Sequence, residues 1–346
     1  MQLSTILNKD NNNLDIIRII AACMVIYGHA YAISPKIGED DLINTLLRFD
    51  YSGSLAVKIF FFISGLVVSN SLLKNRNILN FIISRFFRIW PALITTIVFG
   101  YLISICLSTI SLEQFTKDAP FFKYFFNSMT LKFTWSFPGV FEGNNINTFN
   151  GSLWTIPYEV GAYIIMACSL SLVNYHRNIS IALCIIVIID PILLNGIIFT
   201  NSMHNEEIKF LPFCFSLGVL FSIIKDYIKI NLSNLLMLFF IMTILKYQGS
   251  NLYIPFFYLT FFYFILYLSS VKIMLLLKPK YDISYGVYLW GFPVQQFIAS
   301  YIGNMSIILN QIVSVIVALF FGFISWVIIE EKMMKIGRNI SKSITK

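Results

Sequence analysis

An arginine and a histidine lie on one face of the first apolar segment of the chain. Arg18 and His29 are eleven residues apart, which in a helix is three turns and about 20°. They are therefore separated by about 16 Å along the helix axis. This spacing suits an elongated anionic ligand that Arg18 holds by its charge while the reactive end lies at His29. The alternative is an arginine that reaches toward the membrane surface and a buried, hydrogen-bonded histidine.

A second basic pair precedes the third long apolar segment. Arg85 and Arg88 are three residues apart, so they project from neighbouring positions on one helical face. Paired guanidinium groups bind phosphate through forked hydrogen bonds. Positive charges at this boundary also anchor the cytoplasmic end of a membrane span. The pair predicts either a phosphate site or such an anchor.

A carboxylate lies at the depth of His29. Glu159 is about 10 Å below the outer end of its predicted helix, and His29 is about 8 Å below the outer surface of a 30 Å hydrocarbon core. A carboxylate there could fix the tautomer of the imidazole and stabilise its protonated form. It could equally pair with Lys58 or a hydroxyl. Asp190, in mid-span before Pro191, indicates a structural hydrogen-bond partner rather than a catalyst.

The elements that position these residues are membrane spans. Hydrophobic residues make up 57% of the chain and charged residues only 12%, whereas soluble domains carry about 25% charged residues. Apolar runs of roughly 18 residues or more cross a bilayer as helices. The sequence predicts an all-α, polytopic transmembrane helix bundle of about ten spans: 14–34, 53–73, 89–110, 152–173, 180–200, 208–224, 232–248, 252–271, 283–301 and 307–330.

The basic residues indicate the orientation of the bundle. The net charge of +8 arises at the ends of apolar blocks and not on one soluble face, which argues against a nucleic-acid partner. Most of the 25 Lys and Arg residues fall on one side if both termini are cytoplasmic, so we expect an N-in, C-in protein. We expect one membrane-embedded domain over 1–346, with a core of about 14–330 and a basic cytoplasmic tail at 331–346.

The long connection at 111–151 and the cysteine and histidine residues are also candidate sites. Residues 111–151 are too long for a simple turn and rich in aromatic residues, which predicts an interfacial helix, either a lid over an outward-facing cavity or a plain anchor. The five cysteines lie in apolar blocks without disulfide or zinc spacing. His176 and His204 each fall alone in short loops, so no metal site is expected.

Five motifs in sequence order resemble those of the acyltransferase-3 family of membrane O-acyltransferases. They are LDIIRIIAACMVIYGH (14–29), FFFISGLVVS (60–69), SRFFRIWP (84–91), SLWTIPYE (152–159) and ISYGVYLWGFP (283–293). The resemblance implies a ten-helix domain that takes an acyl group, usually acetyl, from cytoplasmic acyl-CoA. The implied acceptor is a hydroxyl of a surface polysaccharide such as O-antigen or capsule, or of a lipid-linked sugar, and the implied location is the bacterial inner membrane.

The resemblance also assigns residues. The family's arginine–histidine motif falls on Arg18 and His29, its paired arginines on Arg85 and Arg88, and its glutamate on Glu159. Many members have a second histidine where this chain has Gly291. Some members carry a fused extracytoplasmic esterase-like domain, which these 346 residues do not show. We therefore expect this chain to complete the transfer alone or to pass the acyl group to a separate protein.

These assignments imply a mechanism with acetyl-CoA as donor and no metal. His29 would act as general base on the acceptor hydroxyl, with Glu159 as its partner; direct attack by His29, giving an acyl-imidazole, is the other route. Arg18, Arg85 and Arg88 would hold the donor. The candidates for oxyanion or substrate contacts are Ser284, Tyr285 and Tyr288, each of which could instead serve packing.

Two other functions fit a polytopic protein with buried charges. A transporter or flippase for a lipid-linked sugar is the main alternative, although the chain lacks the internal repeats common in transporters. A structural membrane subunit would make no use of an arginine and a histidine on the same face.

Overall fold

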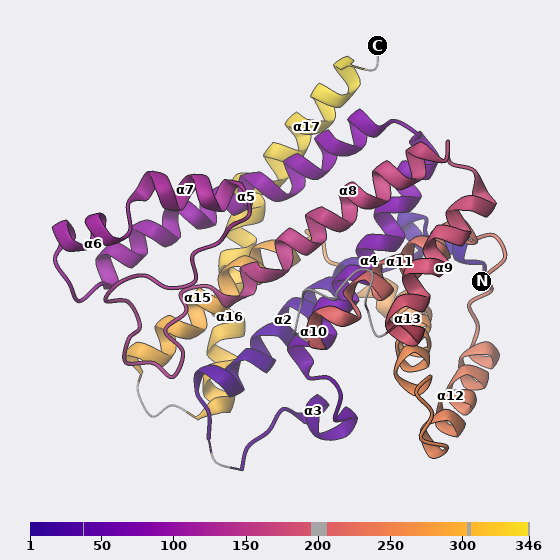
Figure 1. The fold of residues 1–346 in the computed structure, drawn as a ribbon, viewed down its shortest axis with the longest axis horizontal. Helices are drawn as coiled ribbons and strands as arrows, with labels where there is room; N and C mark the ends of the chain where they lie inside the picture. Colours follow the sequence, from indigo (N-terminus) through magenta and orange to yellow (C-terminus); the bar gives the residue numbers. More distant parts are fainter. Residues whose placement is uncertain (37, 195–205, 303–305, 345–346) are drawn as a thin grey trace. The chain divides into compact units, whose positions relative to one another are not determined.

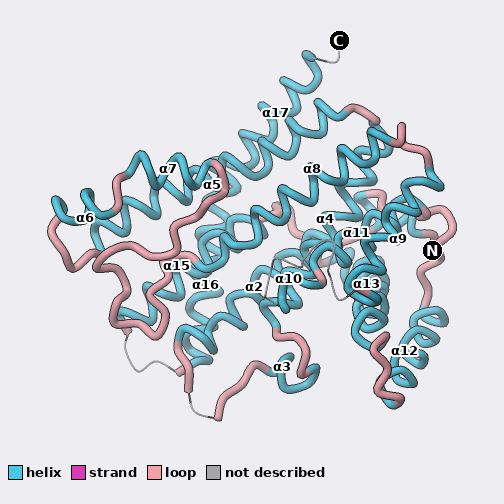
Figure 2. Tube along the Cα trace, viewed as in Figure 1, coloured by secondary structure: helices cyan, strands magenta, loops and turns pink. Residues whose placement is uncertain are grey.

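The described residues of the computed structural model form helices joined by loops, without a named strand (Figures 1 and 2). The structure describes residues 1–36, 38–194, 206–302 and 306–344. Its helices are α1 (Leu3–Ile6), η1 (Lys9–Asn11), α2 (Leu14–Ile33), α3 (Leu42–Leu47), α4 (Ser52–Asn75), α5 (Ile78–Leu107), α6 (Leu112–Asp118), α7 (Phe121–Met129), η2 (Gly151–Thr155), α8 (Ile156–Leu172), α9 (Arg177–Leu193), α10 (Glu206–Lys209), α11 (Leu211–Ile223), α12 (Leu232–Tyr247), α13 (Tyr253–Ser270), α14 (Lys272–Leu276), α15 (Ser284–Tyr301), α16 (Ile307–Ser325), η3 (Trp326–Glu330) and α17 (Glu331–Ile344).

Six helices in the described part of the chain are long and apolar enough to cross a bilayer. They are Leu14–Ile33, Ser52–Asn75, Ile78–Leu107, Gly151–Leu172, Tyr253–Ser270 and Ile307–Ile344. Each of the ten predicted segments overlaps a described helix, and this agreement confirms a helical membrane protein. However, α9, α11 and α12 have only 17, 13 and 16 residues, and 195–200 of one segment lie outside the described residues. The count of ten spans and the N-in, C-in orientation stay predictions.

Two helices extend beyond the segments that hydropathy marks. α5 begins at Ile78, before the predicted start at 89, so Arg85 and Arg88 lie within a continuous helix. The last long helix continues through η3 and α17 to Ile344, into the predicted basic tail. Hydropathy locates only the part of a helix that suits lipid, while backbone hydrogen bonding continues wherever the chain allows it.

The chain folds as two compact units. The first comprises Met1–Arg18, Val57–Ile78 and Gly161–Lys280. In this unit α4 and α11 lie backbone against backbone, because a Cβ on Gly65 would lie 2.1 Å from the carbonyl oxygen of Phe215. Small residues permit this kind of close contact between membrane helices, where backbone packing contributes to association.

Gly65→Ala is expected to destabilise the first unit by more than the ~1–3 kcal/mol typical of overpacking. The added methyl group meets a backbone oxygen, which cannot rotate away as a side chain can. Gly161→Ala is the matched control, since that helical glycine of α8 has nothing within 4 Å of a built Cβ. It should be neutral or stabilising by about 0.5–1 kcal/mol. Thermal midpoints in detergent distinguish the two, and equal midpoints would contradict the close α4–α11 contact.

The second unit comprises Ile19–Ala56, Leu79–Val160 and Tyr281–Lys346. Here α6 and α7, both in the 111–151 connection, lie along α5 (Figure 1). Tyr101 of α5 contacts Phe115, Phe121 and Tyr124, with ring centroids 5.6, 5.0 and 5.5 Å away. The connection therefore contains two packed helices rather than a structureless loop. Its place in a membrane interface or a lid stays a prediction.

Candidate active site

His29 lies against an aromatic ring of α15. The imidazole and Phe292 meet edge to face, with centroids 5.0 Å apart and planes at 77°. Gly291 precedes Phe292, and a Cβ there would lie 2.7 Å from Cγ1 of Ile26 on α2. No side chain fits at position 291 without displacing Ile26. The absence of a side chain at Gly291 therefore allows α15 to lie close to Ile26, and His29 is half-buried beside α15.

Two buried amides fix the turn of α2 that precedes His29. Gln295 of α15 donates from Nε2 to the carbonyl oxygen of Ile26 at 2.8 Å. Gln311 of α16 donates to the carbonyl oxygen of Tyr27 at 3.1 Å. Amide hydrogen bonds inside an apolar bundle are directional and strengthened by the low dielectric. The position of His29 is thus set by α15 and α16 as well as by its own helix.

The η2 segment also contacts Phe292. A Cβ on Gly151 would lie 2.7 Å from Cε2 of that ring, so the backbone of η2 rests against it. Asn150 donates from Nδ2 to the carbonyl oxygen of Leu289 at 2.9 Å. Tyr288 donates to the carbonyl oxygen of Ser152. The start of the 152–159 motif is consequently hydrogen-bonded to α15, and Gly151 just before it lies against the ring that His29 contacts.

Glu159 lies in the first turn of α8 and is half-buried. Its carboxylate is close enough to Tyr285 and Tyr288 for electrostatic interaction with both hydroxyl groups. Glu159 belongs to the second unit, as does α15. Its pairing with His29 stays a prediction.

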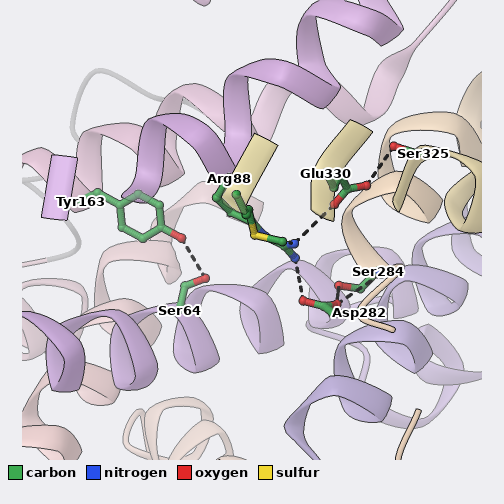
Figure 3. Close-up of polar contacts among 8 residues, drawn as sticks. Ser64, Arg88, Tyr163, Asp282, Ser284, Ser325 and Glu330 are labelled. Carbon is green, nitrogen blue, oxygen red and sulfur yellow. Dashed lines mark hydrogen bonds and ion pairs between the residues drawn. The ribbon is translucent and has the colours of Figure 1, made fainter. Parts of the chain in front are cut away.

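Arg88 is at the centre of a buried ionic cluster (Figure 3). Its guanidinium lies 2.7 Å from Asp282 and 3.4 Å from Glu330, and the three side chains are 12%, 14% and 1% exposed. Ser284 donates to Asp282 at 2.6 Å, and Ser325 donates to Glu330 at 2.9 Å. The cluster joins α5, the start of α15 and the end of η3.

Glu330 ends a π-helical turn within the last long helix. η3 spans Trp326–Glu330 between α16 and α17. Such turns are rare overall, but those that occur are often found at functional sites, because they redirect side chains that a regular helix would place elsewhere. Gly286 allows α15 to lie close to Glu330 and to α16, since a Cβ there would lie 3.1 Å from Oε1 of Glu330 and 2.8 Å from Cα of Gly322.

The three predicted donor-binding arginines have different settings. Arg18 is half-buried in the part of α2 that belongs to the first unit, whereas Arg85 and Arg88 belong to the second. Arg85 is also half-buried on α5. The terminal nitrogens of Arg88 contact carboxylates. Binding of a donor by these residues stays a prediction.

The predicted oxyanion hydroxyls already have acceptors. Ser284 donates to Asp282, Tyr285 donates to the carbonyl oxygen of Ile89 at 3.2 Å, and Tyr288 donates to the carbonyl oxygen of Ser152. A hydroxyl has one hydrogen to donate. In this structure none of the three directs that hydrogen to a substrate position, and their roles stay predictions.

The described residues contain no group of three or more His, Cys, Asp or Glu side chains that could hold a metal ion. His176 precedes α9 and is exposed, while His204 lies outside the described residues. All five cysteines are free. Asp190 is 1% exposed within α9, and its structural role stays a prediction.

Sequence reasoning did not predict four neighbours of the candidate residues. These are Asp282 and Glu330 beside Arg88, Ser152 beside Tyr288, and Phe292 beside His29. Asp282 and Glu330 lie at the ends of apolar segments, where a charged side chain is expected to face water. Their contacts with Arg88 span 194 and 242 residues of sequence. One signal was available. An acid directly before the fifth motif and an acid at the end of the last apolar segment are the natural partners of an arginine at a helix boundary.

Comparisons with known proteins show what the chain is similar to. A family model described as an acyltransferase domain matches residues 11–331. An O-acetyl transferase of Shigella phage Sf6 is 28% identical over 336 residues, which cover 94% of this chain and 96% of the phage protein. Nodulation protein 10 of Rhizobium leguminosarum bv. viciae is 28% identical over 160 residues, 44% of this chain and 42% of that protein. No solved structure matches.

Proposed function

Because the chain belongs to the acyltransferase-3 family, we propose that it transfers an acetyl group from cytoplasmic acetyl-CoA to a hydroxyl of a surface polysaccharide or lipid-linked sugar. The name of the phage relative, which aligns over 94% of this chain, supports acetyl as the group and oxygen as the acceptor atom. One structural observation carries the proposal. His29 is a titratable side chain in an apolar helix; it lies against Phe292, and buried amides hold the helical turn before it.

His29 acts as general base in this proposal. Its neutral imidazole takes the proton from the acceptor hydroxyl as that oxygen attacks the thioester carbonyl. The protonated imidazole then returns the proton to the leaving thiol. Glu159 stabilises the imidazolium. An acyl-imidazole intermediate is the competing route, and a quenched reaction with acetyl on a peptide containing His29 would favour that route over general-base catalysis.

The donor enters from the cytoplasmic side of an N-in, C-in protein in the bacterial inner membrane. Arg85 contacts its phosphates, because guanidinium groups bind phosphate through paired hydrogen bonds. Arg18 guides the donor inward. A phosphate at Arg88 would compete with Asp282 and Glu330 for the terminal nitrogens. We therefore assign the larger share of donor binding to Arg85 and a positioning role to Arg88.

Arg85→Ala is expected to weaken acetyl-CoA binding by about 10- to 100-fold, the loss of a charge-assisted hydrogen bond. Isothermal titration of the purified protein measures this affinity. Arg338→Ala is the matched control, since it removes one exposed positive charge from α17. Unchanged affinity in Arg85→Ala would leave that arginine as a topological anchor.

Acetyl transfer by the purified protein in detergent tests the function itself. Labelled acetyl-CoA and glycan from cells that lack the protein are the substrates, and an alkali-labile label in the glycan is the expected product. A flippase needs two compartments and forms no covalent product, so detergent solution separates the two functions. If folded protein and intact acceptor give no labelled glycan, the proposal is contradicted.

A further inference from the structure

The hydroxyl of Ser152 is buried and lacks a hydrogen-bond partner among the described residues. Ser152 is 1% exposed, and its Oγ contacts no donor or acceptor. Leaving a buried hydroxyl unpaired costs free energy, and such groups in folded proteins call for an explanation. An apolar or smaller side chain would avoid that cost at this position.

The backbone around this hydroxyl is held on both sides. The N–H of Ser152 donates to Oδ1 of Asn150 at 3.2 Å, and its carbonyl oxygen accepts from Tyr288. Asn150 in turn donates to the carbonyl oxygen of Leu289 on α15. Thr155 and Tyr288 also share a hydrogen bond. The hydroxyl is thus carried on a backbone held by hydrogen bonds, and no described residue pairs with it.

The residue before Ser152 lies against the ring that His29 contacts. This residue, Gly151, rests against the edge of Phe292, and the imidazole of His29 meets that ring at 5.0 Å between centroids. All of these residues belong to the second unit. Phe292 is therefore contacted both by the proposed general base and by the residue that precedes Ser152.

We propose that the Ser152 hydroxyl donates a hydrogen bond to the acetyl carbonyl oxygen as it becomes an oxyanion. This inference rests on the proposed function. The acceptor oxygen bonds to the carbonyl carbon, its proton passes to His29, and the carbonyl π electrons move to the oxygen that Ser152 contacts. When the carbon–sulfur bond breaks, the carbonyl re-forms and the thiolate of coenzyme A takes the proton from His29. A neutral donor on a backbone held by hydrogen bonds suits this task, because its position is largely set before the reaction.

Ser152→Ala tests the inference with the full chain in detergent. The expected result is a fall in kcat of about 10²- to 10³-fold, as for removal of one oxyanion donor. The KM for acetyl-CoA and for the glycan should stay within about threefold, because this contact forms only in the transition state. Unchanged kcat would overturn the inference. So would a loss confined to KM or to the thermal midpoint, since either would indicate a packing role.

Ser222→Ala is the matched control. Ser222 of α11 is also 1% exposed and its hydroxyl also lacks a partner among the described residues, but it belongs to the first unit. Its kcat should equal that of the parent protein. An acetyl ester on a peptide containing Ser152 would overturn the donor role and indicate a nucleophile. A parent-level kcat in Ser152→Ala beside the expected large loss in His29→Ala removes only this inference, whereas a parent-level kcat in His29→Ala removes the proposed function.

Discussion

His29→Ala is expected to lower acetyl transfer by about 10²- to 10⁴-fold, the range for removal of a general base. The neutral imidazole is the side chain whose ordinary pKa allows it to take and return a proton near neutral pH. A nucleophilic His29 would produce an equal or larger loss. Initial rates with labelled acetyl-CoA and purified protein in detergent measure the effect.

His29→Gln separates proton transfer from packing, because it keeps a polar side chain beside Phe292. It should lose as much activity as His29→Ala. The control is His176→Ala, which removes an exposed histidine next to α9 and should leave the rate unchanged. Glycan O-acetylation that persists in cells with stably expressed His29→Ala protein would contradict the catalytic assignment.

Glu330→Ala is expected to destabilise the protein by about 3–5 kcal/mol, the range for removing one partner of a buried ion pair. The side chain of Glu330 is 1% exposed and contacts both Arg88 and Ser325. Its removal leaves the guanidinium of Arg88 with less compensating charge in an apolar setting. Thermal or denaturant unfolding in a fixed detergent measures the loss.

Glu331→Ala is the matched control in the next position. Glu331 pairs with Lys335 one helical turn away at 2.7 Å, but the two side chains are 36% and 59% exposed. Exposed helical pairs contribute only about 0.3–0.5 kcal/mol. A double-mutant cycle of Glu330→Ala with Arg88→Met isolates the coupling of the ion pair. Equal destabilisation by Glu330→Ala and Glu331→Ala would show that the buried cluster does not stabilise the fold.

Helix formation and membrane character follow from local sequence. Apolar runs without a polar face can satisfy their backbone in lipid only as helices, so the predicted segments and the described helices coincide. The ends were less predictable. α5 extends back to Ile78 and the last helix reaches Ile344, because polar residues at a membrane boundary end the apolar signal without ending the helix.

By itself, the sequence determined the helical class, the family and the residue types available for chemistry, because length, hydropathy and motif order are properties of a linear chain. Only the tertiary structure decided which side chains contact the candidate residues. Arg88 contacts Asp282 and Glu330 across 194 and 242 residues, and Phe292 adjoins both His29 and Gly151. Contacts between distant segments depend on how helices pack, on glycines that let backbones approach and on a π turn that redirects a carboxylate. No periodicity within a single helix encodes these contacts.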